Sequence, residues 1–394
     1  MRARTICRLS LVLLFGATLM AQLRMLPPPY LPCGGSTLNA TERGQQFRYF
    51  PCHTGFNPDE VVLNPSNVGG LILDWKYETG GAVSSSPAVA QGVVYVGSAD
   101  GYLYALDALT GALLWKFQTA GSITSSPAVA RGVVFVGSFD YNVYALNSLT
   151  GELIWKFLTG QAIESSPTVV DGVVYVGSDD HNVYALNAST GAKLWMYPTW
   201  YNVYSSPAVA NNVVYVGSDD SYLYALNATT GAKLWLAPTS DQVYSSPTVG
   251  DGLVYVASIN SNLYAFDAIT GVQVWEFFPG LGMSSPALAN GTVYIGGSEP
   301  YLHAFNAATG QLLWKTAVGG NVQSSPVVAN GVVYFGSLYR YGYPNIYAVD
   351  AGTGAILWSH PTGNHVNSSP AVADGIVYVG ADDGNLYAFH LLTH

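Results

Sequence analysis

A tripeptide that returns about every forty residues constrains this chain more than any other feature. Ser-Ser-Pro recurs with its proline at positions 87, 127, 167, 207, 247, 286, 326 and 370. A tryptophan recurs in step with it, at positions 75, 115, 155, 195, 235, 275, 314 and 358. Self-similarity at a period of this length is the signature of a repeat architecture, so the 394 residues are expected to fold as copies of one unit.

One unit, from Ser125 to Gly160, predicts four short β-strands separated by turn residues. The predicted strands cover residues 125–129, 133–138, 142–147 and 153–157. Four antiparallel strands repeated radially form the blade of a β-propeller. Hydrophobic residues make up 49% of the chain and charged residues 10%, which suits sheets that are covered on both faces.

The two ends of the repeat region predict how the ring closes. The last repeat ends at residues 386–394, where its fourth strand should begin, and residues 71–80 resemble the fourth strand at 112–119. We therefore predict an all-β fold over residues 70–394: an eight-bladed propeller of four-stranded antiparallel blades, whose last blade is closed by the N-terminal strand.

The segment before the propeller predicts export. Residues 1–21 combine three arginines with an apolar run from Leu9 to Met20, the pattern of a cleavable signal peptide and too short for a membrane span. Residues 22–69 form an extension in which a Cys33–Cys52 disulfide is expected. We expect this extension to be dispensable up to residue 60, and the protein to be secreted or to lie in the periplasm or cell envelope.

Two stretches carry a family resemblance. The run from Asp107 to Trp115, with its copies, resembles the tryptophan-docking repeat of pyrroloquinoline-quinone (PQQ)-like propellers. Residues 63–75 resemble the segment that opens the propeller in quinoprotein alcohol dehydrogenases. The resemblance implies that the eight repeat tryptophans pack against neighbouring blades. It also implies either a quinoprotein oxidoreductase, which would use PQQ with calcium, or an outer-membrane assembly factor, or a binding protein.

The cations that a quinoprotein would need are scarce. PQQ carries three carboxylates, and of the propeller's arginines only Arg340 is expected on the ligand face, since Arg131 lies in an opposite turn. That face carries acidic and amide residues after the second strands, at Asp100, Asp140, Asp180, Asp220, Asn260, Glu299 and Asp383. They are interpreted mainly as turn residues that bond their own backbone. The pairs Asp179-Asp180 and Asp219-Asp220 supply few oxygens for calcium.

Function is expected where the repeats differ. The most variable column stands three residues before each repeat proline and contains Ser84, Thr124, Glu164, Tyr204, Tyr244, Met283, Gln323 and Asn367. Next to it, Trp200 and Tyr201 add two aromatic side chains to one loop. The candidate ligand-binding residues are Glu164, Trp200, Tyr201, Tyr204, Tyr244 and Arg340; tolerant loop positions are the alternative interpretation.

The sequence thus predicts an exported binding or scaffold protein without catalysis of its own or a cofactor. A protein, peptide or carbohydrate ligand on the loop face is expected, with a monomeric chain. The net charge of −10 excludes the basic surface that nucleic-acid binding requires. The alternatives are the PQQ-dependent alcohol dehydrogenase and the envelope assembly factor, and no metal site is predicted.

Overall fold

The computed structural model describes residues 46–259, 262–278, 283–343 and 345–392. Pro32–His394 forms one compact unit. The predicted signal peptide and Cys33 lie outside the described residues. Cys52 is fully buried and disulfide-bonded, and its pairing with Cys33 stays a prediction.

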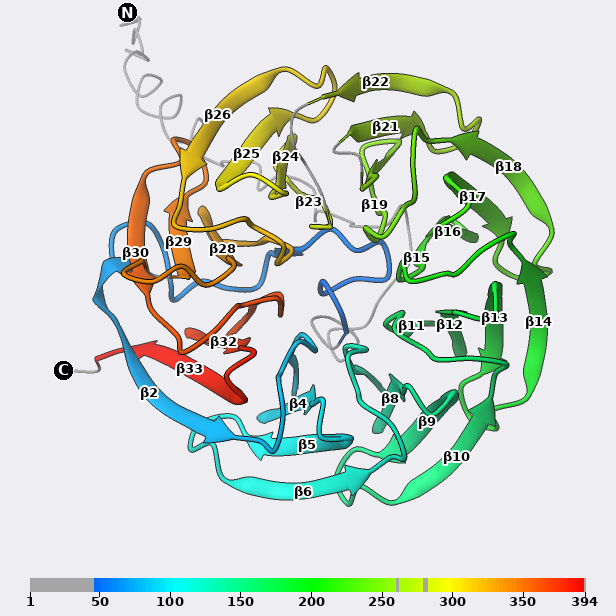
Figure 1. The fold of residues 1–394 in the computed structure, drawn as a ribbon, viewed down its shortest axis with the longest axis horizontal. Coiled ribbons are helices and arrows are strands. Elements are labelled where there is room, and N and C mark those ends of the chain that lie inside the picture. Colours follow the sequence, from blue (N-terminus) through cyan, green and yellow to red (C-terminus); the bar gives the residue numbers. More distant parts are fainter. Residues whose placement is uncertain (1–45, 260–261, 279–282, 344, 393–394) are drawn as a thin grey trace, which may run out of the picture. The chain divides into compact units, whose positions relative to one another are not determined.

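Eight antiparallel sheets follow one another along the chain, and Figure 1 shows them arranged around a centre. The first four are β3 (Ala88–Ala90), β4 (Val93–Gly97), β5 (Tyr102–Asp107) and β6 (Leu113–Gln118); β7 (Ala128–Ala130), β8 (Val133–Gly137), β9 (Asn142–Asn147) and β10 (Leu153–Leu158); β11 (Thr168–Val170), β12 (Val173–Ser178), β13 (Asn182–Asn187) and β14 (Lys193–Pro198); and β15 (Ala208–Ala210), β16 (Val213–Ser218), β17 (Tyr222–Asn227) and β18 (Lys233–Pro238). We call these sheets blades 1 to 4.

Blades 5 to 8 follow the same plan. They are β19 (Thr248–Gly250), β20 (Leu253–Ala257), β21 (Leu263–Asp267) and β22 (Gln273–Phe277); β23 (Ala287–Ala289), β24 (Thr292–Ile295), β25 (Tyr301–Asn306) and β26 (Leu312–Ala317); β27 (Val327–Ala329), β28 (Val332–Gly336), β29 (Ile346–Asp350) and β30 (Ile356–His360); and β31 (Ala371–Ala373), β32 (Ile376–Gly380), β33 (Asn385–Leu391) and β2 (Leu71–Glu78). Blade 7 gains a fifth strand, β1 (Phe56–Asn57), parallel to β27, and a short 3₁₀ helix, η2 (Val68–Gly70), precedes β2. Of the four strands that recur in each blade, the first is nearest the centre and the fourth is outermost (Figure 1); in blade 7, β1 is added on the inner side of β27.

The predicted closure of the ring is confirmed. Strand β2 pairs antiparallel with β33, from Leu71 opposite Leu391 to Glu78 opposite Asn385, so the N-terminal strand completes blade 8. Because the first and last parts of the propeller share one sheet, no blade is left with a missing outer strand.

The repeat tryptophans join each blade to the next, as the family resemblance implied. Each indole N–H donates to a backbone carbonyl of the following blade at 2.8–3.2 Å. The last of these bonds, from Trp358 to the carbonyl of Leu71, joins blade 7 to the completed blade 8. Gly151 shows why the neighbouring turn carries glycine: its φ is +72° and an added Cβ would lie 2.7 Å from the Trp115 ring.

The Ser-Ser-Pro repeat is explained by two hydrogen bonds per blade. The first serine hydroxyl accepts from a backbone N–H of the second strand of its own blade, for example Gly137 to Ser125 at 3.1 Å. The backbone N–H of the second serine donates to the equivalent hydroxyl of the next blade, at 2.9–3.2 Å. These bonds form a closed circle, because Ser369 donates to Ser86.

Residues 46–57, which we call the channel segment, run through the centre of the ring (Figure 1). The inner strands of blades 3 to 8 each donate one N–H to this segment, from Val169, Val209, Val249, Leu288, Val328 and Val372. The acceptors are the Gln46 side chain, the carbonyls of Pro51, Cys52, Thr54 and Gly55, and the Tyr49 hydroxyl. This segment fills hydrogen-bonding positions that strand pairing leaves open. These contacts argue against the expectation that the chain is dispensable up to residue 60, which stays a prediction.

Candidate functional site

The loops that connect one blade to the next, and those that connect second to third strands, lie on one face of the ring because the strands alternate in direction. We call this the loop face and its centre the mouth. The variable column predicted from the sequence lies in the blade-to-blade loops, beside the circle of serines. Its members Glu164, Tyr204 and Tyr244 come from three successive loops that lead into blades 3, 4 and 5.

The acidic column after the second strands is structural. The carboxylate of Asp180 accepts from the backbone N–H groups of Gly160 and Asn182 and from the hydroxyl of Tyr184. Asp100, Asp140, Asp220 and Asp383 make the equivalent bonds in their blades. Asn260 lies outside the described residues. The sequence interpretation of these acids as turn formers is thus borne out in five blades.

These hydrogen bonds also shift the pKa values of two of the turn acids, Asp100 and Asp383. Burial alone would raise the pKa of Asp100, but the donors Tyr104, Tyr102 and Gly80 outweigh it and hold this pKa below its ordinary value. The pKa of Asp383 is lowered in the same way, by Tyr387, Asn385 and Gly363 against the effect of burial. Carboxylates that accept this many hydrogen bonds stay ionised, and their oxygens already have partners within the fold.

The residues immediately before two of these acids behave differently. Asp179 is 8% exposed, and its Oδ1 atom is buried without a hydrogen-bond partner. The Oδ1 atom of Asp219 is also buried and unpartnered. Together with Glu164 they form a group of three carboxyls that is close enough to interact electrostatically. Burial of polar groups without partners is unfavourable, so Asp179 and Asp219 differ in this respect from the turn acids beside them.

The electrostatics of this group follow from burial and repulsion. Desolvation, followed by the charges of Glu164, Asp219 and Asp180, raises the pKa of Asp179 to about 7. Desolvation, followed by Asp220 and Glu164, raises the pKa of Asp219 to about 7. Burial also raises the pKa of Glu164. Asp179 and Asp219 therefore change charge near neutral pH, whereas the pKa values of Asp100 and Asp383 lie below the ordinary value.

Two tyrosines border the three carboxyls. The rings of Tyr204 and Tyr244 meet edge to face, with centroids 5.0 Å apart and planes at 84°. The amide of Asn202 donates to the Tyr204 hydroxyl at 2.6 Å and orients that ring. The charges of Asp179, Asp219 and Glu164 contribute to the raised pKa of Tyr204, after burial. We call the set Glu164, Asp179, Asp219, Tyr204 and Tyr244 the acidic cup.

The other predicted aromatics lie farther along the same loop. Trp200 is 69% exposed and meets Tyr222 edge to face at 5.9 Å, whereas Tyr201 is 61% exposed and meets His181 at 6.2 Å. The four aromatic residues that the sequence grouped as one platform thus divide into an exposed pair and a half-buried pair with different ring partners.

Arg340 is not brought to the cup. It is exposed in the loop between β28 and β29 of blade 7, and its guanidinium lies 5.0 Å from the ring centroid of Tyr343 in the same loop. The sequence placed it correctly on the loop face, but its contact is with its own insertion.

Blade 8, opposite blade 4 in the ring, offers a comparison within the mouth. Asp382 occupies the same repeat position as Asp179 and Asp219. It accepts hydrogen bonds from Ser84 at 2.9 Å and from Asn367 at 2.8 Å, both of them members of the variable column. A mouth carboxylate is therefore either satisfied by its neighbours, as in blade 8, or left without partners, as in blades 3 and 4.

The sequence interpretation missed Asp179 and Asp219 as site residues, although their pairing with the turn acids was noticed. The available signal was the repeat itself: five of the six equivalent positions in the other blades have uncharged residues, so an acid there serves no shared turn. These five are Ala99, Phe139, Ile259, Ser298 and Leu338, and the sixth is Asp382. Within the described ranges, no three His, Cys, Asp or Glu side chains are arranged to hold a metal ion.

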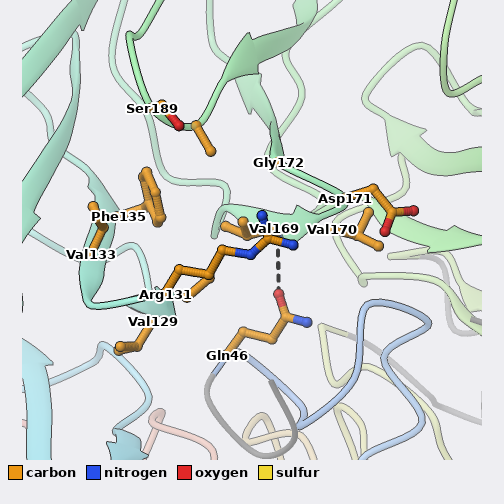
Figure 2. A pocket seen from close by; sticks show the side chains of 12 residues that line it. Gln46, Val129, Arg131, Val133, Phe135, Val169, Val170, Asp171, Gly172 and Ser189 are labelled. Carbon is orange, nitrogen blue, oxygen red and sulfur yellow. Dashed lines mark hydrogen bonds between the residues drawn. The ribbon is translucent and has the colours of Figure 1, made fainter. Parts of the chain in front are cut away.

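A cavity of about 120 Å³ opens on the opposite face, between blades 2 and 3. Figure 2 shows the Arg131 side chain extending across it toward Gln46, with Val133 and Phe135 on one side. Arg131 lies in the turn after the first strand, as the sequence predicted.

Comparison with known proteins agrees with this architecture. The profile of a family described as outer membrane protein assembly factor BamB matches residues 72–202, 200–285 and 279–393. No curated protein matches significantly.

Several solved structures share the fold. BamB from Moraxella catarrhalis is 20% identical over 81% of this chain and 99% of its own, with a TM-score of 0.69. A europium-containing methanol dehydrogenase is 15% identical over 89% of this chain and 98% of its own, with a TM-score of 0.77. A quinohemoprotein alcohol dehydrogenase from Comamonas testosteroni is 17% identical over 90% of this chain and 81% of its own, with a TM-score of 0.78. At these identities the likeness shows the fold alone.

Proposed function

This chain belongs to the PQQ-like β-propeller repeat family described as outer membrane protein assembly factor BamB, and on that premise we propose that it is a binding protein of the cell envelope. Its loop face, around blades 3 to 5, binds a polypeptide partner, and the chain carries out no catalysis of its own. The role in assembly that the family description gives favours a polypeptide over a carbohydrate.

The exposed pair Trp200 and Tyr201 carries this proposal. Trp200 is 69% exposed and stands at a position where the other blade-to-blade loops have small residues: Gly80, Ala120, Gly160, Ser240, Gly319 and Gly363. Trp200 and the adjacent Tyr201 together form an exposed aromatic patch, and exposed apolar patches rimmed by polar residues mark interaction sites. Tryptophan and tyrosine are also the residues that most often dominate binding energy at protein interfaces.

The quinoprotein alternative is not supported by the residues at the mouth. PQQ is a tricarboxylate, whereas the mouth presents the carboxyls of Glu164, Asp179, Asp219 and Asp382. Arg340, the cation expected to face such a ligand, is stacked on Tyr343. Negative groups at these positions would repel the cofactor, so the donor set does not fit it.

Within the described ranges no helix has the length and apolar character to cross a membrane. Location in the envelope follows from the family description and from the predicted signal peptide, and the monomeric state stays a prediction.

Site-specific photocrosslinking tests the proposal. A photoreactive amino acid at position 200 should capture one discrete protein in cells that naturally express this chain, because that side chain points away from the fold. The matched control is position 114, where Leu114 is 50% exposed on the outer strand β6 and should capture much less. Equal capture at both positions, or no discrete product at position 200, would contradict the proposed loop-face site.

A further inference from the structure

We propose that the acidic cup receives the cationic side chain of a lysine or arginine that the partner polypeptide inserts into the mouth. This inference deepens the proposed function and rests on it. In this proposal the carboxyls of Asp179, Asp219 and Glu164 bind the positive charge of that side chain. The rings of Tyr204 and Tyr244 contact its alkyl stem and its cationic head.

The unpartnered carboxyl of Asp179 is the first observation. The residue is 92% buried, since its exposed fraction is 8%, yet its Oδ1 atom has no donor. Buried acceptors in native proteins almost always have a partner, so a missing donor indicates one that comes from outside the chain. In the part of the chain that the structure describes, neither Asp179 nor Asp219 forms an ion pair with a lysine or arginine.

The contrast with blade 8 is the second, independent observation. Asp382 stands at the same repeat position and receives two donors from this chain, Ser84 and Asn367. The matching column residues are Glu164 and Tyr204 for Asp179, and Tyr204 and Tyr244 for Asp219. None of the three donates to the Oδ1 atom of Asp179 or Asp219. The fold can therefore supply hydrogen-bond donors to a carboxylate at this repeat position. In blades 3 and 4 the positions of those donors are taken by an acid and by aromatic rings instead.

The chemistry of the cup selects an organic cation. Carboxyl oxygens accept from ammonium or guanidinium N–H groups, and tyrosine rings attract the same cations through their faces. A metal ion is a poorer fit, because among the described residues no three carboxyls are grouped tightly enough to coordinate one. An anionic ligand would meet only like charge at this place.

A pH dependence follows from the same geometry. The groups that face the cup from the packed elements are all acidic or phenolic: Glu164, Asp179, Asp180, Asp219, Asp220, Asp241, Tyr204 and Tyr244. Burial and mutual repulsion raise the pKa of Asp179 and Asp219 to about 7. A bound cation favours the ionised forms and lowers both pKa values, so binding releases protons and strengthens as the pH rises from about 6 to 8.

Calorimetry with small probes tests this inference without the native partner. Nα-acetyl-lysine methylamide and Nα-acetyl-arginine methylamide should bind the purified chain saturably, whereas the uncharged norleucine analogue should not. At pH 7 the binding enthalpy should depend on the ionisation enthalpy of the buffer, because protons are released. Free spermidine provides a third arm: saturable binding of spermidine without binding of the capped lysine or arginine would overturn the assignment to a protein side chain.

Isosteric variants locate the binding. The double variant Asp179→Asn, Asp219→Asn should weaken lysine binding about tenfold or more, since it removes two charge-assisted contacts. Asp382→Asn is the matched control and should change the affinity less than about twofold, because its carboxyl is already occupied within the chain. The inference is wrong if the charged and norleucine probes behave alike, or if the double variant and the control bind equally well.

The two proposals can fail separately. If crosslinking at position 200 captures a partner from the double variant as efficiently as from the parent chain, the loop-face function stands and the cationic side chain is refuted. If the capped lysine binds the cup but position 200 captures nothing, the cup stands as a cation site and the proposed partner surface fails.

Discussion

The interior of the channel and its mouth differ in how far their contacts repeat from blade to blade. In the interior, the serine hydroxyls and the channel segment give the inner strands their hydrogen-bond partners, and the same contacts recur blade after blade. At the mouth the residue type changes from blade to blade: the variable column has Glu164, Tyr204 and Tyr244 in three successive loops and smaller or uncharged residues elsewhere. Repetition marks what the fold needs, and departure from it marks what the fold leaves free.

Asp179 and Asp180, which are neighbours in one loop, differ in the same way in the hydrogen bonds of their carboxyl oxygens. Asp180 accepts four hydrogen bonds in the blade 3 turn, whereas Asp179 has a buried oxygen without any partner. Both are aspartates after the same strand, so residue type alone does not separate them. The two residues differ in their hydrogen-bond partners, and for this reason we expect substitutions at Asp180 and at Asp179 to change stability in opposite directions.

The largest effect is expected from the interior. Deleting the channel segment, residues 46–57, removes acceptors from six inner strands. At about 1 kcal/mol for each lost hydrogen bond, and about 2 °C for each kcal/mol in a domain of this size, the melting temperature should fall by about 10 °C or more. Differential scanning calorimetry of the deleted and parent chains measures this change.

A control keeps the result specific. Replacing Val61 by alanine alters the same extension just beyond the channel segment, at a side chain that is 76% exposed, and should leave the melting temperature within about 1 °C. If the deletion melts like the parent, the channel segment is not a structural part of the propeller and the interior is no different from the mouth.

A smaller loss is expected at the turn acid. Asp180→Ala removes the acceptor of Gly160, Asn182 and Tyr184, and should lower the free energy of unfolding by about 2–3 kcal/mol. Glu299→Ala changes the equivalent position in blade 6, where the side chain is exposed, and should cost less than about 0.5 kcal/mol. Urea unfolding at pH 7 compares the two variants; equal losses would show that the turn bonds do not stabilise the blade.

The adjacent acid should give the opposite sign. Burial and neighbouring charges raise the pKa of Asp179 to about 7, so the folded state binds its proton more tightly than the unfolded chain does. Stability on account of this group therefore falls as the pH rises from about 4 to 7, and Asp179→Asn should remove that loss. Its melting temperature should exceed that of the parent by about 2 °C or more at pH 8, and by less at pH 5. A gain that is independent of pH would show that the carboxyl is not perturbed.

The sequence predicted the repeated blades far better than the channel segment or the mouth, for a physical reason. Strand order, closure by β2 and the role of Trp115 follow from a pattern that eight copies confirm against one another. The channel segment has no copy and little strand pattern, so its hydrogen bonds to distant inner strands could not be foreseen. Asp179 was equally hidden, because its significance depends on donors that Asp382 has and it lacks.

The smallest stability effect is expected where the largest binding effect is proposed. Trp200→Ala, Tyr201→Ala removes two side chains that are 69% and 61% exposed, so the melting temperature should stay within about 1–2 °C of the parent. A matched change on the outer strands, Leu114→Ala with Leu313→Ala, removes side chains that are each 50% exposed and should lower the melting temperature as little.

Crosslinking then compares the two variants, from a photoreactive amino acid placed at Met283 of the variable column, whose side chain is 48% exposed. Only the aromatic variant should lose the captured partner, because hot-spot aromatics at interfaces contribute about 2 kcal/mol or more to binding. If the aromatic variant melts several degrees lower than the outer-strand variant, these rings belong to the fold, and the proposed partner surface on the loop face fails.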